Sequence, residues 1–499
     1  MTFSSLRAFI DALSARSDLV RLQQPVSPLL EATELASQVQ AANGPALLLD
    51  NAGSDEHPLL LNLFGHQRRI ETVFSQRPVK GLRELGALLS QLQQPRLPGG
   101  LRALISDWPE LAQIGLSVSR HRQEAEFMAN VLEGTEVDLE RFPIQQCWPG
   151  DAGRLITLGL VVTWNPRLQR SNIGIYRQQL IGRNRVIMRW LSHRGGAQDF
   201  AEWQRSRPGE PFPVAVVIGA DPATTLAAVA PVPDTLSEFQ FAGLLRGAPS
   251  RLYRLSASQL EVPASAEIVL EGVIHPGDEA LEGPFGDHTG HYNAQRMYPV
   301  LTVERLHYRD RAIYQGSFMG KSPHDEPSVL ASALNDLFVP MIQRIFPEIV
   351  DFYLPPAACS YRIALVSIDK RYPGHAQRIM MGVWSYLRQF TYTRFVVVFD
   401  ADINIRSGTE TLWALANHVD PARDSLIVPR TPVDVLDFAG QTPGLGSKLG
   451  IDATRKLPGE TDRSRPEPIK PDAAVAERMA SLCQAALRAC EKNSQPTTN

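Results

Sequence analysis

Between residues 120 and 320 the sequence is a succession of short strand patterns separated by turn residues. Segments rich in β-branched and aromatic residues recur at 155–164, 212–220, 251–258, 266–274, 298–308 and 312–318. One segment among them, residues 234–246, has a helical pattern. Many short strands joined by turns are typical of a barrel or a sandwich, and they argue against a sheet of alternating strands and helices.

The stretch from residue 172 to residue 196 predicts a β-hairpin that binds an anion. Residues 173–180 and 185–191 have strand composition, and the residues between them supply a turn at Gly182, Arg183 and Asn184. The stretch carries the cationic or potentially cationic residues Arg177, Arg183, Arg185, Arg189, His193 and Arg194. A buried guanidinium needs an anionic partner, so we expect a negative group there. The alternative is a solvated sheet face with alternating arginines.

Two regions of α/β character flank these strands. The first, residues 1–115, has helical patterns at 3–16, 28–42 and 80–93 and apolar strands at 46–51 and 59–65. After Pro340, strands at 361–368, 394–403 and 425–429 alternate with helices at 374–390 and 408–419, which predicts a parallel α/β domain. We therefore expect three domains, 1–115, 116–325 and 326–455. A Pro-rich, charged tail at 456–499 follows, and its last helix, 474–491, would dock on a neighbouring subunit or on its own body.

The length of 499 residues is too great for one core, and a net charge of −3 gives no electrostatic case for binding nucleic acid. The cysteines, Cys147, Cys359, Cys483 and Cys490, show no paired spacing, which favours a reducing, cytoplasmic location. The N-terminus lacks the apolar core of a signal peptide, and no apolar run reaches membrane-spanning length. Peripheral membrane contact stays open.

Asn172 and Glu238 are candidate metal ligands, because an amide oxygen and a carboxylate beside a phosphate commonly hold Mg²⁺ or Mn²⁺. For Glu238 the alternative is a capping box that starts at Thr235. His193 is a candidate third ligand, although a lone histidine is more often a hydrogen-bonded core residue.

The loop GDEALEGPFGDHTGHYN brings Glu282, Asp287, His288 and His291 within ten residues. Clustered carboxylates raise one another's pKa, which would suit a proton donor. The alternatives are a polar turn that faces water and a metal site made by Asp287, His288 and His291.

The C-terminal region offers weaker candidates. Asp400 and Asp402 end an apolar strand and would hold a divalent metal or cap the following segment. The glycines of GLGSKLG, residues 444–450, do not have the spacing of a dinucleotide fingerprint. An apolar helical stripe is expected in the core or in a subunit interface, and it consists of Met380, Met381, Trp384 and Leu387.

Several long motifs resemble the UbiD family of prenylated-flavin decarboxylases, in the same order and spacing over roughly residues 5–470. They are NIGIYRQQLIG, MRWLSHRGG, PVPDTLSEFQFAGLLRG, EVPASAEIVLEG, EGPFGDHTGHYN and FPEIVDFYLPP. The resemblance implies an N-terminal α/β domain, a central split β-barrel that binds prenylated FMN, and a C-terminal α/β domain for assembly into a homohexamer. It also implies Mn²⁺ at the flavin phosphate with K⁺ nearby, and a flavin prenyltransferase that supplies the cofactor.

By motif match the metal ligands would be Asn172, Glu238 and His193. The resemblance implies cofactor contacts from Ile175, Tyr176, Arg177, Arg189, Trp190, Leu191, Arg194 and Gly195. Asp287 would be the proton donor, and Arg177 and Glu282 would complete the catalytic network. Many family members have Glu where this chain has Asp287, although the ubiquinone branch shares the aspartate.

The similarity is greatest to that ubiquinone branch, which implies decarboxylation of 4-hydroxy-3-polyprenylbenzoate to 2-polyprenylphenol and CO₂. Loss of CO₂ from an aromatic acid leaves a carbanion with no orbital to delocalise it, so a cofactor must act as the electron sink. A prenyl tail would require an apolar entrance and access to lipid. The final helix and the strip Phe239, Phe241 and Leu244 are candidates, with burial in the core as the alternative.

The alternative functions are those of a family member acting on a different aromatic or unsaturated acid, a metal-dependent hydrolase or transferase, and a flavin-binding assembly protein without catalytic activity.

Overall fold

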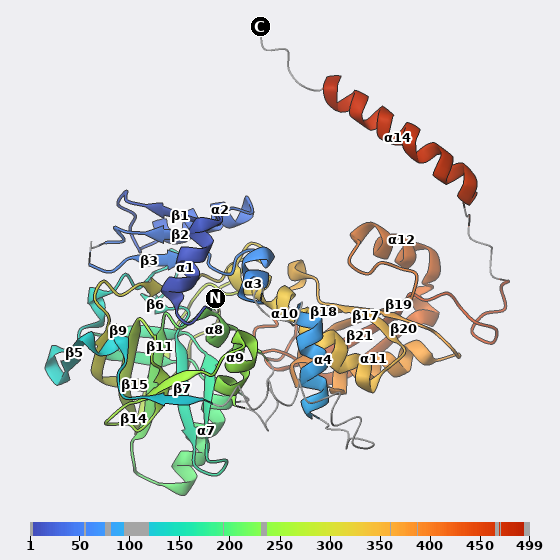
Figure 1. Cartoon of the computed structure of the whole chain (residues 1–499). Coiled ribbons are helices and arrows are strands. Elements are labelled where there is room, and N and C mark those ends of the chain that lie inside the picture. Colours follow the sequence, from blue (N-terminus) through green and yellow to red (C-terminus); the bar gives the residue numbers. More distant parts are fainter. Residues whose placement is uncertain are drawn as a thin grey trace, which may run out of the picture. The chain divides into compact units, whose positions relative to one another are not determined.

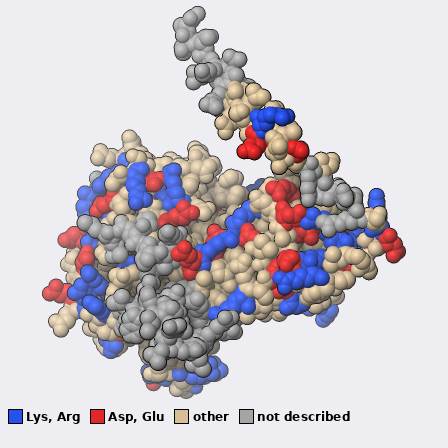
Figure 2. All heavy atoms as spheres, turned by 45° about the vertical axis from the view of Figure 1, so that its right-hand side comes forward, with Lys and Arg blue, Asp and Glu red and all other residues tan. Residues whose placement is uncertain are grey.

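The computed structural model describes residues 3–53, 56–74, 81–93, 119–192, 194–230, 237–359, 361–386, 388–464, 469 and 471–493 (Figure 1). The chain divides into two units. The first comprises Met1–Lys370 and His375–Thr454, and the second comprises Arg371–Gly374 and Arg455–Asn499. On the face shown in Figure 2, Lys and Arg side chains are interspersed with Asp and Glu side chains, in keeping with a net charge of −3.

The N-terminal part of the first unit is a small sheet with helices. Its strands run in the order β1-β2-β3-β16: β1 (Leu19–Leu22), β2 (Ala46–Leu49), β3 (Leu59–Leu61) and β16 (Tyr314–Gln315). Its helices are α1 (Leu6–Ala15), α2 (Glu31–Ala41), α3 (Gln67–Phe74) and α4 (Leu82–Gln93). Alternate residues of β2 enter different cores, since Leu47 packs with residues of the central sheet and Leu48 packs with residues of α1. The predicted α/β character is confirmed.

The central part is built on a nine-stranded sheet in the described residues, ordered β6-β9-β10-β15-β14-β11-β7-β8 with β5 on β15. These strands are β5 (Asn130–Glu133), β6 (Leu155–Ile156), β7 (Leu160–Asn165), β8 (Arg170–Ile175), β9 (Gln178–Gly182), β10 (Arg185–Met188), β11 (Phe212–Ile218), β14 (Ile268–Glu282) and β15 (Arg296–Tyr308). A smaller sheet contains β4 (Arg120–Arg122), β12 (Arg251–Arg254) and β13 (Glu261–Pro263). The predicted succession of short strands is confirmed.

The predicted hairpin is only partly correct. β9 and β10 do pair antiparallel, with Gly182 opposite Arg185, so the turn lies where we expected it. The first strand, however, does not run continuously from residue 173 to residue 180. It breaks at Tyr176 and Arg177, and β8 on the other side of the break pairs with β7. Composition could not reveal this break, because the residues on both sides of it favour strands.

The central part also contains more helix than we predicted. Besides α9 (Glu238–Arg246), it includes α7 (Gly195–Ser206) and α8 (Pro222–Ala227). We did not predict α7 because it begins with two glycines, which have a low helix propensity. The capping box of α9 is formed by Ser237 and Gln240, and Glu238 is the first helical residue. The expected capping role of Glu238 is therefore wrong, while Thr235 lies outside the described residues.

The C-terminal part of the first unit is a five-stranded sheet ordered β17-β18-β19-β21-β20. Its strands are β17 (Ile349–Tyr353), β18 (Ile363–Ile368), β19 (Phe395–Asp400), β20 (Ser425–Pro432) and β21 (Leu445–Asp452), and its helices are α10 (Glu326–Ile345), α11 (His375–Tyr386), α12 (Gly408–His418) and α13 (Pro421–Asp424). The parallel pairing of β18 with β19 is confirmed, but β20 is antiparallel to β21. GLGSKLG forms most of β21, so it is no phosphate-binding loop.

Two of the four residues in the predicted apolar stripe of α11 are core residues. Met380 and Trp384 are buried, Met381 is 56% exposed, and Leu387 lies outside the described residues. Phe239, Phe241 and Leu244 are buried core residues too, so they form no entrance for a prenyl tail.

The second unit contains α14 (Ala473–Asn493), which confirms the predicted last helix. Its Val475, Met479 and Leu482 side chains are exposed. None of the helices in the described ranges is long and apolar enough to cross a membrane. Short 3₁₀ helices complete the first unit: η1 (Glu126–Ala129), η2 (Gly134–Glu136), η3 (Leu139–Arg141), η4 (Pro356–Ala358) and η5 (Arg388–Tyr392).

Candidate active site

The guanidinium of Arg177 is the centre of a buried network. The break between β8 and β9 places it inside the central part, where its side chain is 5% exposed. Its Nε donates to Oε1 of Glu282 at 2.8 Å, its Nη1 to Oδ2 of Asp287 at 3.0 Å, and its Nη2 to Oδ1 of Asn293 at 2.8 Å. The structure thus brings together the three predicted catalytic residues.

A second arginine balances the charge of the network. Arg189 follows β10, with Nε 3.9 Å from Oε2 of Glu282 and Nη1 4.0 Å from Oδ2 of Asp287. Burial lowers the pKa of Arg177, and nearby Arg189 lowers it further, while Glu282 and Asp287 oppose both effects. Two guanidinium groups and two carboxylates together carry no net charge, which makes their burial tolerable.

The segment after β14, residues 283–293, is called the acidic loop here. Side-chain oxygens accept hydrogen bonds from its backbone. The N–H of Gly283 donates to Oε1 of Gln179, that of Phe285 to Oδ1 of Asn293, and that of Gly286 to Oδ1 of Asp151, each at 2.9 Å. These bonds satisfy donors that an irregular segment cannot pair by itself. They also fix the backbone immediately before Asp287.

Asp287 is stabilised as a carboxylate. Its Oδ1 accepts the backbone N–H of His288 at 2.8 Å and lies 2.6 Å from Nδ1 of the same histidine. Burial raises the pKa of Asp287, but His288, Arg177 and Arg189 outweigh burial and hold that pKa well below its usual range. The expectation that clustered carboxylates raise this pKa is therefore wrong, because cationic groups surround Asp287.

The amide of Asn172 is oriented by a chain of hydrogen bonds. Its Nδ2 donates to Oγ1 of Thr163 at 3.3 Å, and Thr163 donates to Oδ2 of Asp199 at 2.6 Å. Asn165 donates to the other oxygen of Asp199 at 2.6 Å. With its nitrogen committed to Thr163, Asn172 has its oxygen available as a hard ligand for a cation.

Glu238 lies against the same strand as Asn172. Its carboxylate accepts a hydrogen bond from the backbone of Ile173, the next residue along β8. Burial raises the pKa of Glu238 to about 7, opposed by that hydrogen bond and by Arg170. Glu238 thus contacts β8 at the residue after Asn172, whereas His193 lies outside the described residues.

Helix α7 begins beside Asn172. Its N-cap residue, Arg194, is exposed and makes no side-chain capping bond. A Cβ on Gly195 would lie only 2.4 Å from Oδ1 of Asn172, so the helix backbone approaches that amide closely. The N–H of Gly196 donates to the hydroxyl of Tyr176 at 3.1 Å. A helix start next to a cation ligand suits a phosphate and its metal.

The remaining predicted cofactor residues border this region. Ile175 ends β8 and is half-buried, and Leu191 packs near Tyr298. Trp190 is buried among Tyr176, Phe200 and Phe212.

Other predicted site residues do not join the network. Arg183 pairs with Asp138 and Arg185 pairs with Asp278 on the surface, so neither contributes to a buried anion site, contrary to our expectation for the hairpin. The structure does not assemble the alternative metal sites. In the described part of the chain, no group of three or more His, Cys, Asp or Glu side chains is placed to hold a metal ion, and this includes Asp287, His288, His291, Asp400 and Asp402.

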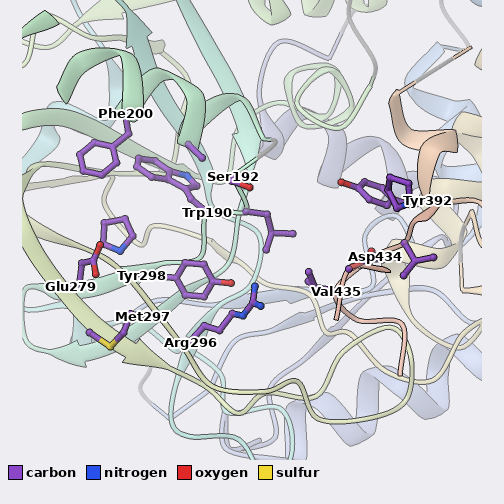
Figure 3. A pocket seen from close by; sticks show the side chains of 16 residues that line it. Trp190, Ser192, Phe200, Glu279, Arg296, Met297, Tyr298, Tyr392, Asp434 and Val435 are labelled. Carbon is purple, nitrogen blue, oxygen red and sulfur yellow. The ribbon is translucent and has the colours of Figure 1, made fainter. Parts of the chain in front are cut away.

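A cavity of about 630 Å³ opens beside Trp190, Leu191 and Ser192. Arg296 and Tyr298 of β15 line one side and Tyr392, Asp434 and Val435 line the other, as Figure 3 shows. Arg296 is the register partner of Glu282, so this cavity wall adjoins the Arg177 network. Its lining combines apolar side chains with a few polar groups, as is usual for small-molecule sites.

Four buried polar atoms around this network have no hydrogen-bond partner in the described residues: Nε of Arg189, Oε2 of Glu282, Nε1 of Trp190 and Nε2 of His288. Unpaired buried polar groups are rare in proteins, so these atoms fit a polar ligand. A flavin with its phosphate, ring nitrogens and carbonyl oxygens would fit such a set of donors and acceptors.

Our reading of the sequence missed several residues that support this site. Asn293 ends the motif EGPFGDHTGHYN, Gln179 lies within NIGIYRQQLIG and Thr163 within the predicted strand 155–164, but none of them gave a separate signal, and Asp151 and Asp199 stand in segments that we did not single out. Their roles arise from contacts across the fold, so spacing alone could not find them.

Three family models match the chain. They describe the N-terminal domain (residues 10–89), the Rift-related domain (residues 119–322) and the C-terminal domain (residues 328–453) of UbiD, 3-octaprenyl-4-hydroxybenzoate carboxy-lyase.

Solved structures give the same result. The UbiD-class enzyme HmfF from Pelotomaculum thermopropionicum in complex with FMN is 26% identical, with a TM-score of 0.76 over 93% of this chain and 97% of that chain. An evolved dimeric form of HmfF in complex with prFMN is also 26% identical, with a TM-score of 0.75 over 93% and 97% of the two chains. Vanillic acid decarboxylase from Sedimentibacter hydroxybenzoicus in its closed form shares the fold at 23% identity, with a TM-score of 0.83 over 97% of this chain and 99% of that chain.

With all three domains matched in order and the predicted catalytic residues gathered in one buried network, the chain belongs to the UbiD family of carboxy-lyases.

Proposed function

We propose that this protein decarboxylates 4-hydroxy-3-polyprenylbenzoate to 2-polyprenylphenol and CO₂ in ubiquinone biosynthesis, with prenylated FMN as its cofactor. The observation that carries the proposal is the buried contact of Arg177 with Glu282 and Asp287 next to a ligand-sized cavity. Such a buried group of ionisable residues beside a cavity is characteristic of a catalytic site.

The cofactor phosphate would bind at the start of α7. Asn172 and Glu238 would hold Mn²⁺ there, with K⁺ nearby, and the metal would supply positive charge for the phosphate. His193 is proposed as a third ligand from the motif match alone. The complexes of HmfF with FMN and with prFMN support a flavin as the cofactor. When bound, the modified flavin would supply the electron sink that loss of CO₂ requires.

The chain's own residues would bind the substrate and move a proton. Arg177 would orient the substrate carboxylate, and Asp287 would deliver a proton to the carbon that has lost CO₂. Asp287 must first be protonated. Of the groups that hydrogen-bond to it, the His288 imidazole beside Oδ1 would pass a proton to it, because guanidinium groups and backbone amides keep theirs.

The cavity lining supports an aromatic acid that carries an apolar tail. Leu191, Phe200, Met297, Val433 and Val435 provide apolar surface along it. Arg296, Tyr298 and Glu279 provide polar groups that would equally suit a hydroxybenzoate without a tail. A family member acting on another aromatic or unsaturated acid is therefore the second candidate, and vanillic acid decarboxylase shows that the fold accommodates such activity.

The substrate and the family imply further properties that we include in the proposal. These are a cytoplasmic location with peripheral contact at the inner face of the cell membrane, a homohexameric assembly, and a flavin prenyltransferase as the supplier of the cofactor. Flotation with anionic liposomes tests the membrane contact, and mass photometry tests the assembly. Recovery of all the protein in the lipid-free fraction at low salt would contradict membrane contact.

One experiment separates this proposal from its rivals. The protein is expressed with and without a flavin prenyltransferase, its visible absorbance is recorded, and CO₂ release is measured with 3-prenylated 4-hydroxybenzoate and with unprenylated hydroxybenzoates. We expect turnover only after coexpression, and faster turnover of the prenylated acid.

The variant Asp287→Asn tests the role of the network within that experiment. We expect it to lose turnover at least 100-fold, as for removal of a general acid, while it keeps its flavin. Metal-dependent hydrolysis without flavin absorbance would favour a hydrolase. Flavin binding without turnover of any acid in the wild type would favour an assembly protein.

A further inference from the structure

Asn293 occupies a special position in the Arg177 network. It follows the acidic loop, and its side chain is buried inside the central part of the chain. Its Oδ1 accepts two hydrogen bonds, from Nη2 of Arg177 at 2.8 Å and from the backbone N–H of Phe285 at 2.9 Å. Its Nδ2 donates to the carbonyl of Ala294 at 2.8 Å, which fixes the orientation of the amide.

These bonds join the guanidinium to the backbone of the acidic loop. The N–H of Asn293 also donates to the carbonyl of Phe285 at 3.0 Å, so residues 285 and 293 are bonded in both directions. The ring of Phe285 lies against the guanidinium of Arg177, 5.2 Å from its central carbon. One amide thereby fixes the Arg177 side chain, the aromatic ring beside it and the segment that leads to Asp287.

The neutrality of this amide matters for the charge of the network. Arg177 contacts two carboxylates and one amide, and together with Arg189 the group has no net charge. A third carboxylate in the position of Asn293 would compete for Arg177 and leave a buried negative charge. A nearby negative charge disfavours ionisation of a carboxyl group, so the pKa of Asp287 would increase.

We propose that Asn293 is a positioning residue for the decarboxylation, which holds Arg177 and the acidic loop at a fixed distance while adding no charge to them. This inference rests on the proposed function. Asn293 does not line the cavity and acts through Arg177, so its loss should lower kcat more strongly than it raises KM.

The variant Asn293→Ala tests the positioning. Without the amide oxygen, the N–H of Phe285 and Nη2 of Arg177 lose their partner. We expect kcat to fall about 100-fold, as when catalytic groups are misplaced by an ångström, with a smaller rise in KM and retained flavin. Hydrogen–deuterium exchange measured by mass spectrometry should become faster in residues 283–293. Exchange and kcat both equal to those of the wild type would overturn the proposal.

The variant Asn293→Asp tests the neutrality. It keeps both acceptor bonds, so exchange in residues 283–293 should stay close to that of the wild type. The pH profile of kcat should move to higher pH by about one unit or more, since a further carboxylate raises the pKa of Asp287. A profile that superimposes on that of the wild type would contradict the charge argument.

Asn335→Asp is a matched control. Asn335 is buried in α10 and bonds the backbone of Phe352 and Leu354, far along the chain from the acidic loop and without a guanidinium partner. We expect it to lower thermal stability and to leave the pH profile unchanged. If the wild type releases no CO₂ from any aromatic acid, the proposed function fails, while the exchange of residues 283–293 in Asn293→Ala still decides whether Asn293 positions the loop.

Discussion

At the scale of single residues, the chemistry of this protein centres on the state of one carboxyl group. Asp287 is buried, yet Arg177, Arg189 and His288 keep it ionised in the absence of substrate. A proton donor that rests as a carboxylate must be reloaded in each turnover, which makes its hydrogen-bond partners part of its function. The same contacts also contribute to stability, because they exist only in the folded state.

We predict that His288→Ala destabilises the protein at neutral pH by about 1.5–3 kcal/mol, the usual range for a hydrogen bond to a charged group. The folded-state pKa of Asp287 lies below its unfolded-state value of about 3.9. The stabilisation is therefore present above that value, and it is lost as pH falls towards the folded-state pKa. Removing His288 raises the folded-state pKa, so the difference from the wild type should shrink below about pH 4.

Thermal unfolding at a series of pH values measures this effect. His291→Ala is the control, since the His291 side chain lies on the same loop, is exposed and does not bond to Asp287, while alanine keeps the backbone carbonyl that accepts the N–H of Asp287 at 3.1 Å. Equal destabilisation by the two substitutions at pH 7 would show that the bond to Asp287 is not the cause.

At the scale of elements, the site depends on where β8 ends and where α7 begins. β8 breaks at Tyr176, which sends Arg177 inward, and α7 starts at Gly195 against the Asn172 amide. The first event builds the acid–base network and the second builds the proposed phosphate site. A short stretch of chain thus contributes to both the network and the proposed phosphate site.

We predict that Gly195→Ala weakens Mn²⁺ binding 10-fold or more, in the range seen when the supporting groups of a metal site are disturbed. The new Cβ would lie 2.4 Å from Oδ1 of Asn172, so the ligand must move. Gly182→Ala is the control, because the nearest atom to its Cβ would be 3.9 Å away. Metal content after dialysis and flavin absorbance measure both effects, and equal metal content in the two variants would refute the role of this close approach.

At the scale of the whole molecule, the cavity is made by two parts of the first unit. Arg296 and Tyr298 come from the central sheet, whereas Tyr392, Asp434 and Val435 come from the C-terminal part (Figure 3). The hydroxyl of Tyr361 donates to Asp434, which ties that wall to the C-terminal sheet. We therefore expect substrate selection to involve residues that are far in the sequence from the proposed cofactor-binding residues.

We predict that Val435→Asp raises KM for the prenylated acid about 10-fold or more and affects an unprenylated acid much less. A charge in the apolar wall would oppose burial of the tail, since burying an unpaired charge is costly. Met381→Asp is the control, because it places the same charge on an exposed position of α11 outside the cavity. Steady-state kinetics with both acids decide the matter, and equal effects on both would argue against a tail in this cavity.

The sequence by itself determined the fold class and pointed to the residues that we propose for the catalytic network. Strand composition and turn residues are local properties, so they predicted the many-stranded central part, and long motifs singled out Arg177, Glu282 and Asp287. Only the tertiary structure decided the break in β8, the start of α7, the low pKa of Asp287 and the contacts of Asn293. The physical reason is that these features depend on contacts between separate elements, such as that of Arg177 with Asp287 across 110 residues, and no local pattern records such a contact.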